Sequence, residues 1–116
     1  MTPQSAKAKG RKLQQDTIKI IRKYFYGLEE DDLRSTSMGA GGEDVQMSPK
    51  AKKLIGLSIE CKNQKAIAVY NWIDQAVSNA GAAEPVVVAK ANKRKPIVIV
   101  DAEFFFKVLS ERNQRE

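Results

Sequence analysis

The 116-residue sequence contains no histidine. This absence excludes Ser-His-Asp and Cys-His hydrolysis, nucleases with a histidine nucleophile, and most zinc sites. If the protein is an enzyme, carboxylates and lysine must therefore carry its chemistry. The single cysteine, Cys61, excludes a disulfide within the chain, and a reducing cytoplasm is the simplest compartment for it.

Long apolar runs are also missing. No stretch approaches the ~18 consecutive apolar residues of a membrane-spanning helix, and polar and basic residues follow Met1, so we expect a soluble protein without a signal peptide. A chain of this length fits one domain. Its net charge of +6 favours a polyanionic partner, above all nucleic acid, although charge alone does not separate DNA from RNA or from an acidic membrane surface.

Two strand-like segments carry the residues that indicate an active site. In residues 57–62, side chains alternate between two faces, so Glu60 and Lys62 share the face opposite to an apolar one. Residues 42–47 repeat the alternation around Asp44. If the two strands pair as an antiparallel hairpin, Asp44 lies beside Glu60.

Neighbouring carboxylates repel each other unless a cation neutralises them, and an all-oxygen ligand set suits Mg²⁺ or Mn²⁺. The ammonium group of Lys62 beside such an ion can orient an attacking water or offset charge on a phosphate. These residues therefore indicate hydrolysis of a phosphodiester. The alternative is a solvated strand face with a surface ion pair between Glu60 and Lys62.

The pattern of Asp44 followed by Glu60-Cys61-Lys62 resembles the Asp…Glu-x-Lys signature of the PD-(D/E)XK nuclease superfamily, which includes restriction endonucleases and archaeal Holliday junction resolvases. The run Arg-Ser-Thr-Ser-Met-Gly-Ala-Gly-Gly-Glu-Asp-Val-Gln-Met-Ser-Pro, residues 34–49, is similar to small endonuclease-like proteins of phages and prophages. The similarity covers residues 10–109. It implies a Mg²⁺-dependent DNA endonuclease with an α/β, restriction-endonuclease-like fold, a mixed central sheet flanked by helices. A phage-encoded protein would act in the cytoplasm of its bacterial host.

The resemblance also implies roles for individual residues. Asp44 and Glu60, with the backbone carbonyl of Cys61, would hold the metal, and Lys62 would position or activate the attacking water. Gln75 resembles a glutamine that many of these nucleases place near the scissile phosphate. In the superfamily a residue of the first helix, often Glu, also points toward the metal. The comparable positions of this chain are Gln14 and Gln15, and one of them would complete the catalytic residues.

Residues that flank these segments are candidates for DNA contact. Residues 1–12 are basic and contain no acid, and we expect them to form a flexible arm. A glycine-rich loop before Asp44 offers backbone amides to a phosphate. An ordinary solvated surface is the alternative for the basic residues. The DNA-binding candidates are Lys9, Arg11, Lys12, Arg34, Ser37, Gly39, Asn63, Lys93 and Arg94.

Apolar spacing and turn residues divide the chain into elements. Helices are predicted at 13–26, 65–79 and 101–109, with a short helical turn at 48–54, and strands at 34–37, 42–47, 57–62, 85–90 and 96–100. The last two strands contain β-branched runs and are almost continuously apolar, so we expect both to be covered on both faces. The predicted apolar face of helix 65–79 consists of Ala66, Val69, Tyr70, Ile73, Ala76 and Val77. The domain limits are an arm at 1–12, one nuclease domain at 13–110 and a polar tail at 111–116.

The sequence leaves two other functions open. A Holliday junction resolvase acts on opposed strands and would need a dimer, and one of the phenylalanines at 104–106 is a candidate for its interface, because three adjacent aromatic residues cannot all face inward. The second is a non-catalytic nucleic-acid-binding protein on the same fold, or a partner-binding protein with a basic surface. A sedimentation measurement separates a monomer from a dimer.

Overall fold

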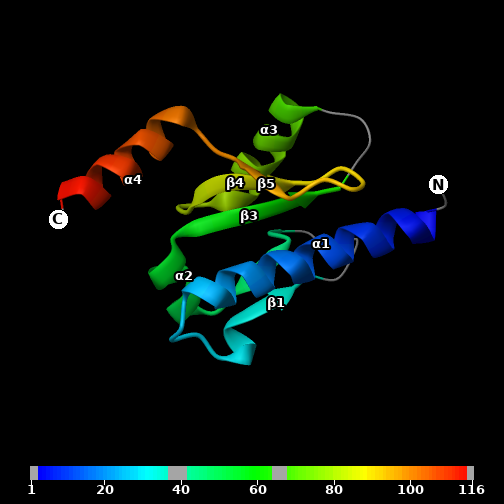
Figure 1. The fold of residues 1–116 in the computed structure, drawn as a ribbon, viewed down its shortest axis with the longest axis horizontal. Helices are drawn as coiled ribbons and strands as arrows, with labels where there is room; N and C mark the ends of the chain where they lie inside the picture. The colour runs from blue at the N-terminus through cyan, green and yellow to red at the C-terminus, as the bar shows by residue number, and fades with distance from the viewer. Residues whose placement is uncertain (1–2, 37–41, 64–67, 115–116) are drawn as a thin grey trace.

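The computed structural model describes the fold of residues 3–36, 42–63 and 68–114. Within these ranges the chain has an α/β architecture, in which helices accompany a mixed three-stranded sheet and a two-stranded sheet (Figure 1). The elements, in chain order, are α1 (Pro3–Tyr24), η1 (Glu30–Asp32), β1 (Leu33–Ser35), β2 (Val45–Met47), α2 (Pro49–Ile55), β3 (Leu57–Lys62), α3 (Val69–Ala80), β4 (Glu84–Ala89), β5 (Ile97–Ile99) and α4 (Ala102–Gln114).

The three-stranded sheet has the order β3-β4-β5. Strand β3 is parallel to β4, with α3 as the crossover between them, and β5 is antiparallel to β4. Strands β1 and β2 form the second, antiparallel sheet. The predicted hairpin between the strands at 42–47 and 57–62 is therefore wrong. Strand β2 pairs with β1 instead, and the seven-residue helix α2 separates β2 from β3 along the chain.

Helices α1 and α3 cover opposite faces of the β3–β4 pair (Figure 1). On β4, Val86 and Val88 belong to the core cluster that contains Leu13 of α1, whereas Val87 belongs to the cluster that contains Trp72 of α3. Strand β4 is thus buried on both faces, which confirms the prediction for residues 85–90.

Strand β5 does not meet the same expectation. Ile97 and Val98 are both exposed, so the prediction that residues 96–100 form a central strand covered on both faces is wrong. The cause is the strand order, because α1 packs on β1 and β3 and α3 packs on β3 and β4, while β5 lies at the far side of the sheet.

Both terminal helices are longer than predicted. Helix α1 begins at Pro3, so the expected irregular arm is wrong for residues 3–12. Lys, Arg, Ala and Gln predominate there, and their helix propensity allows the helix to extend. Helix α4 continues to Gln114, so the polar residues after 110 continue the helix rather than ending it.

Helix α3 is rotated relative to its predicted apolar face. Its buried residues are Trp72, Ala76 and Ala80, whereas Tyr70 and Val77 are exposed. Apolar residues occur on more than one side of this helix, so spacing alone did not determine which side packs. Of the expected apolar face, Ala66 lies outside the described residues.

The short helix α2 matches the helical turn predicted at 48–54. The Ser48 hydroxyl caps it by accepting a hydrogen bond from the Ala51 N–H at 3.1 Å, and Pro49 occupies its first turn. Gly56 ends the helix in the left-handed region, at φ 72°, where a side chain would be strained.

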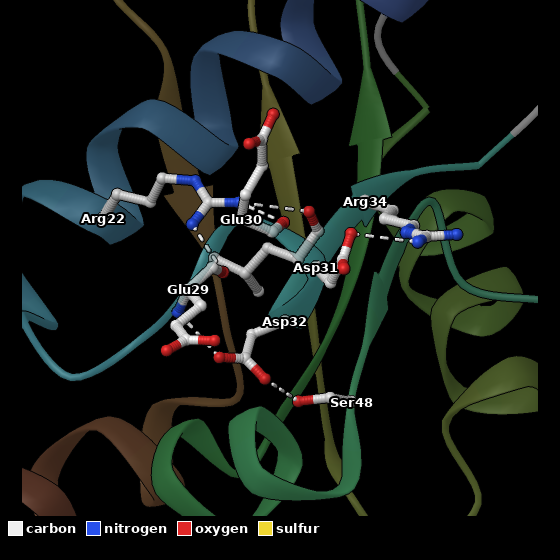
Figure 2. Close-up of polar contacts among 8 residues, drawn as sticks. Arg22, Glu29, Glu30, Asp31, Asp32, Arg34 and Ser48 are labelled. Atoms are coloured by element: carbon white, nitrogen blue, oxygen red, sulfur yellow. Dashed lines mark hydrogen bonds and ion pairs between the residues drawn. The ribbon is translucent and has the colours of Figure 1, made fainter.

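Figure 2 shows how the acidic connection before β1 is fixed to its neighbours. Arg22 of α1 donates to the carbonyl oxygens of Glu29 and Glu30, at 2.9 and 2.7 Å. Asp32 accepts a hydrogen bond from the Ser48 hydroxyl at 2.6 Å, which is the main cause that lowers the pKa of Asp32 from its ordinary value. These contacts join α1 and the start of α2 to the β1–β2 pair.

Of the helices in the described ranges, none has the length and apolar character required to cross a membrane.

We expect Leu13→Ala to lower the free energy of unfolding by about 3 kcal/mol, because the side chain is almost completely buried between α1 and the sheet. Ile20→Ala is the matched control, since Ile20 lies on the same helix but is about half exposed, and it should cost less than about 1 kcal/mol. Urea unfolding measures both values. Equal costs would contradict this packing of α1.

Candidate active site

Asp44 is held in place by the backbone on both sides of it. Its N–H donates to the carbonyl of Ile59 in β3 at 3.1 Å, and its carbonyl accepts from the Thr36 N–H, next to β1, at 2.9 Å. The Asp44 carboxylate then accepts a hydrogen bond from the Cys61 N–H at 2.8 Å. These bonds bring Asp44 against the middle of β3 although β2 is not a strand of that sheet.

Glu60 and Lys62 follow on the same face of β3. The Glu60 side chain is almost fully buried, and its Oε2 lies 3.2 Å from the Lys62 Nζ. The same Nζ donates to the Gln75 Oε1 of α3 at 2.8 Å. The structure therefore brings Asp44, Glu60, Lys62 and Gln75 together, as the sequence predicts, and α3 packs on β3 beside Glu60 and Lys62.

Burial decides between the two interpretations of Glu60 and Lys62. A solvated surface ion pair requires both groups to be accessible, but Glu60 is only 4% exposed. Ser58, on the same face of the strand, is buried as well. The polar face of β3 thus lies beneath α3 rather than in water, and the surface interpretation is wrong.

The surroundings of Glu60 disfavour its ionised form. Burial is the largest cause that raises the pKa of Glu60 above its ordinary value, followed by the negative charge of Asp44, while the ammonium of Lys62 acts in the opposite direction. The buried carboxylate of Glu60 therefore lies near the partly exposed carboxylate of Asp44 and beside the ammonium group of Lys62. A cation bound between the carboxylates would relieve this repulsion.

The two glutamines of α1 differ in position. Gln14 is buried and accepts a hydrogen bond from the Ser35 hydroxyl of β1, whereas Gln15 is exposed. Ser35 is paired with Val45, the residue after Asp44. Gln14 is therefore directed at the strand pair that carries Asp44, and it is the better candidate for the supporting role.

The Cys61 thiol faces α1 rather than the carboxylates. Its Sγ lies 3.8 Å from the Thr17 hydroxyl oxygen, within the core cluster on that side of the sheet. Burial raises the pKa of the thiol to about 12, so it is not ionised at neutral pH. Only the backbone of Cys61 is available to the site. Its N–H already binds Asp44, and its carbonyl as a metal ligand stays a prediction.

The candidate DNA contacts divide into distinct groups. Lys9 of α1 donates to the side chain of Asn92 at 2.9 Å, which brings the start of α1 to the loop between β4 and β5 (Figure 1). That loop also carries Lys93, in the left-handed region at φ 63°, and Arg94. We call this group the basic end; it consists of Lys9, Lys90, Lys93, Arg94 and Lys95.

The basic end is joined directly to the candidate site. The Lys90 N–H donates to the Lys62 carbonyl at 2.9 Å, so the β3–β4 ladder leads from Lys62 into the basic loop. Asn63, which follows Lys62, is partly buried at the same end of β3.

The remaining DNA-binding candidates are less closely connected to the site. Lys12 forms an ion pair with Asp16 at 2.9 Å, and Arg34 forms one with Asp31 at 3.0 Å. Arg11 is exposed on α1. Ser37 and Gly39 lie outside the described residues. For all of these side chains, DNA contact stays a prediction.

Sequence reasoning missed several residues that position the site. Ser35 and Thr36 bind Gln14 and the backbone of Asp44, and Lys90 and Asn92 connect the basic end. Hydroxyl residues within a short predicted strand and an asparagine within a basic loop are weak signals. Their role depends on which strands become neighbours, and spacing along the chain does not report that.

The donor set is compatible with a hard divalent cation. Among the described residues no group of three or more His, Cys, Asp or Glu side chains is positioned to hold a metal ion. Protein ligation would therefore come from the carboxylates of Asp44 and Glu60 and a backbone carbonyl, with water or substrate oxygens as the other ligands. Mg²⁺ is commonly bound in this way, by one or two carboxylates and substrate phosphates.

No family model matches the chain, and no curated protein or solved structure shows significant similarity to it. The resemblance to the PD-(D/E)XK superfamily therefore stays a prediction. A functional conclusion must rest on the geometry around Glu60.

We expect Glu60→Gln to raise the free energy of unfolding by about 1 kcal/mol at pH 7, because the substitution removes a buried negative charge beside Asp44. The folded protein holds the Glu60 proton more tightly than the unfolded chain does. Protonation of Glu60 therefore stabilises the folded state. This stabilisation is complete below the ordinary pKa of 4.5 and is lost as the pH rises through the raised pKa of the folded state.

The difference in free energy of unfolding between Glu60→Gln and the wild type should consequently decrease as the pH falls toward 4.5. Chemical unfolding at both pH values measures it. Asp74→Asn, at an exposed carboxylate of α3, is the control and should change stability little at either pH. A gain that does not depend on pH would show that ionisation of Glu60 is not its cause.

Proposed function

We propose that this protein is a metal-dependent DNA endonuclease with a restriction-endonuclease-like fold. One observation carries the proposal: the buried carboxylate of Glu60 lies beside the ammonium group of Lys62 and near the carboxylate of Asp44. Such a group is costly for stability and is suited to phosphodiester hydrolysis.

Asp44 and Glu60 would hold the divalent ion, with the backbone carbonyl of Cys61. When bound, such an ion polarises a phosphoryl oxygen and lowers the pKa of a coordinated water. The chain supports this chemistry by fixing both carboxylates on rigid backbone. Asp44 is tied to β3 through its main chain and through its side chain, and Glu60 lies within β3.

Lys62 supplies the positive charge of the site. An ammonium group has three N–H donors. Two of its contacts, to Glu60 and Gln75, are within the protein and aim the Nζ along a defined direction. The remaining donor is suited to a phosphate oxygen or to the attacking water. Gln75 thus acts as a positioning residue for Lys62.

The basic end supports nucleic acid as the substrate. Its side chains come from α1 and from the loop after β4, and the Lys90 to Lys62 hydrogen bond places the start of that loop next to the site. A phosphodiester backbone bound along these residues would therefore lead toward Lys62. The net charge of +6 favours the same partner.

Cleavage of end-labelled duplex and four-way-junction DNA with Mg²⁺, Mn²⁺ or EDTA tests the activity. Lys62→Ala should lower the cleavage rate by at least ~100-fold, because it removes a charge aimed at the phosphate. Glu60→Gln should cause a loss at least as large while DNA binding persists. Lys19→Ala, an exposed lysine of α1, is the control and should cleave normally.

Metal-dependent cleavage that survives in Glu60→Gln would refute the assignment of the site. Preference for the junction would identify a resolvase. Tight, salt-sensitive binding without any cleavage by the wild-type protein would instead indicate the non-catalytic nucleic-acid-binding alternative.

The basic end gives a separate prediction. The double variant Lys93→Asn and Arg94→Ala should weaken DNA binding similarly for all sequences and reduce the slope of log K against log salt by about two, one for each phosphate that the variant no longer neutralises. Asparagine is chosen at position 93 because it tolerates the left-handed φ of 63° found there. Filter binding at several salt concentrations measures the slope, and an unchanged slope would contradict a phosphate contact at this end.

A further inference from the structure

A pocket lies at the start of β3, between α2 and the carboxyl-terminal end of α3. Its volume is about 620 Å³, which is within the range of ~300–1,000 Å³ typical of sites for small ligands. The α2–α3 pocket is lined by two lysines, an acid, an amide and apolar side chains, among them Glu43, Lys52, Lys53, Leu57, Asn79 and Ala80.

The three lysines of α2 differ in what they contact. Lys50 donates to the carbonyl of Gly27 at 2.6 Å, so its ammonium group is occupied within the fold. Lys52 and Lys53 line the pocket, and within the described residues neither ammonium group takes part in a hydrogen bond or an ion pair. Two exposed cationic groups are therefore available at the pocket, against the single carboxylate of Glu43.

The pocket adjoins the candidate site through two elements. Its Glu43 is the residue before Asp44. Its Asn79 follows Gln75 by four residues of α3, so the two amide side chains lie on the same side of the helix, ~6 Å apart along its axis. Because Gln75 binds Lys62, this side of α3 leads from the lysine of the site to the pocket.

The pocket and the basic end lie at opposite ends of β3. Leu57, the first residue of the strand, lines the pocket, whereas the Lys62 carbonyl at the other end binds the Lys90 N–H. Glu60 lies between them, three residues from Leu57, which is ~10 Å at the rise of a β-strand. This distance corresponds to about three nucleotides at the 3.4 Å rise of a duplex strand, and to fewer if the strand is extended.

The lining of the pocket fits a nucleotide better than an isolated anion. The carboxylate of Glu43 repels an anion, but it accepts hydrogen bonds from the amino group of a base, as does the amide oxygen of Asn79. Leu57 and Ala80 offer apolar surface to the face of a base. With the two lysines for the flanking phosphates, each part of a nucleotide has a partner in the pocket.

A base can enter such a pocket only when it is not paired. In a duplex each base is stacked between its neighbours and bonded to its partner, so a side pocket does not reach it unless it is extruded. Proteins that bind single strands combine cationic groups for the backbone with apolar surfaces for the bases. The α2–α3 pocket contains both kinds of group.

We propose that the α2–α3 pocket holds one unpaired nucleotide of the strand bound at the candidate site, about two or three nucleotides from Glu60 and on the side away from the basic end. This inference rests on the proposed function, because it takes a strand bound at Lys62 as its starting point. It specifies the substrate further, as a continuous strand that is held on both sides of the cleaved bond and is unpaired on one of them.

Fluorescence anisotropy in EDTA, with a labelled single strand and a fully paired duplex of the same sequence, tests the pocket without cleavage. Ala82→Phe places a large side chain on the exposed turn that lines the pocket and leaves every charge in place. It should raise the dissociation constant for the single strand at least ~10-fold, because the base contact is lost, and that for the duplex less than ~2-fold.

The double variant Lys52→Gln and Lys53→Gln tests the phosphate contacts. It should lower the slope of log K against log salt for the single strand by about 0.7 for each phosphate that it no longer neutralises. Lys19→Gln with Lys23→Gln is the matched control, since it removes the same charge from exposed positions of α1, which covers the opposite face of the sheet. This control should leave the slope unchanged.

Wild-type affinity of Ala82→Phe for the single strand would overturn the proposal, and so would an equal loss of affinity for both DNAs. A pocket that binds free dAMP, with DNA affinity unchanged in Ala82→Phe, would overturn it as well and would indicate a site for a free nucleotide. The expected binding results in a protein that never cleaves DNA would support the pocket and refute the nuclease, so the two proposals fail separately.

Discussion

The hydrogen bond from the Cys61 N–H to the Asp44 carboxylate is the contact on which the candidate site depends. It acts together with the bond from the Asp44 N–H to the Ile59 carbonyl. Through these bonds the two-stranded sheet is attached to β3 without becoming part of its sheet. Because they anchor the backbone as well as the carboxylate, Asp44 can stay beside Glu60 although their charges repel each other.

The two faces of β3 serve different purposes because different helices cover them. Under α1 the strand contributes Ile59 and Cys61 to an apolar core, which supplies stability. Under α3 it presents Glu60 and Lys62, where the helix provides Gln75 as a polar partner. Burial of Glu60 on this second face strengthens its interactions with the charges of Asp44 and Lys62. The apolar packing on one side of the strand thus offsets the cost of the crowded charges on the other.

Sequence patterns predicted the local features well and the spatial arrangement only in part. The alternation in residues 57–62 placed Glu60 and Lys62 on one face, and the Ser48-Pro49 pair predicted α2. Strand pairing was wrong for β2, and the exposure of β5 was missed, because β-branched runs look alike in central and outer strands. The sequence did not show which of Gln14 and Gln15 faces the site. The structure distinguishes them through the contact of Gln14 with Ser35, which depends on packing between distant segments.

The hydrogen bond between Lys9 and Asn92 has a practical consequence for how the protein is handled. It places the amino-terminal helix against the basic end, and the carboxyl-terminal helix carries the exposed phenylalanines at the opposite side of the molecule (Figure 1). An affinity tag or a bulky fluorophore at either terminus would therefore sit beside a surface of interest. The turn at Tyr26 and Gly27 follows the end of α1 that is farther from Lys9 and is solvent-exposed, so it is the better attachment point for a label.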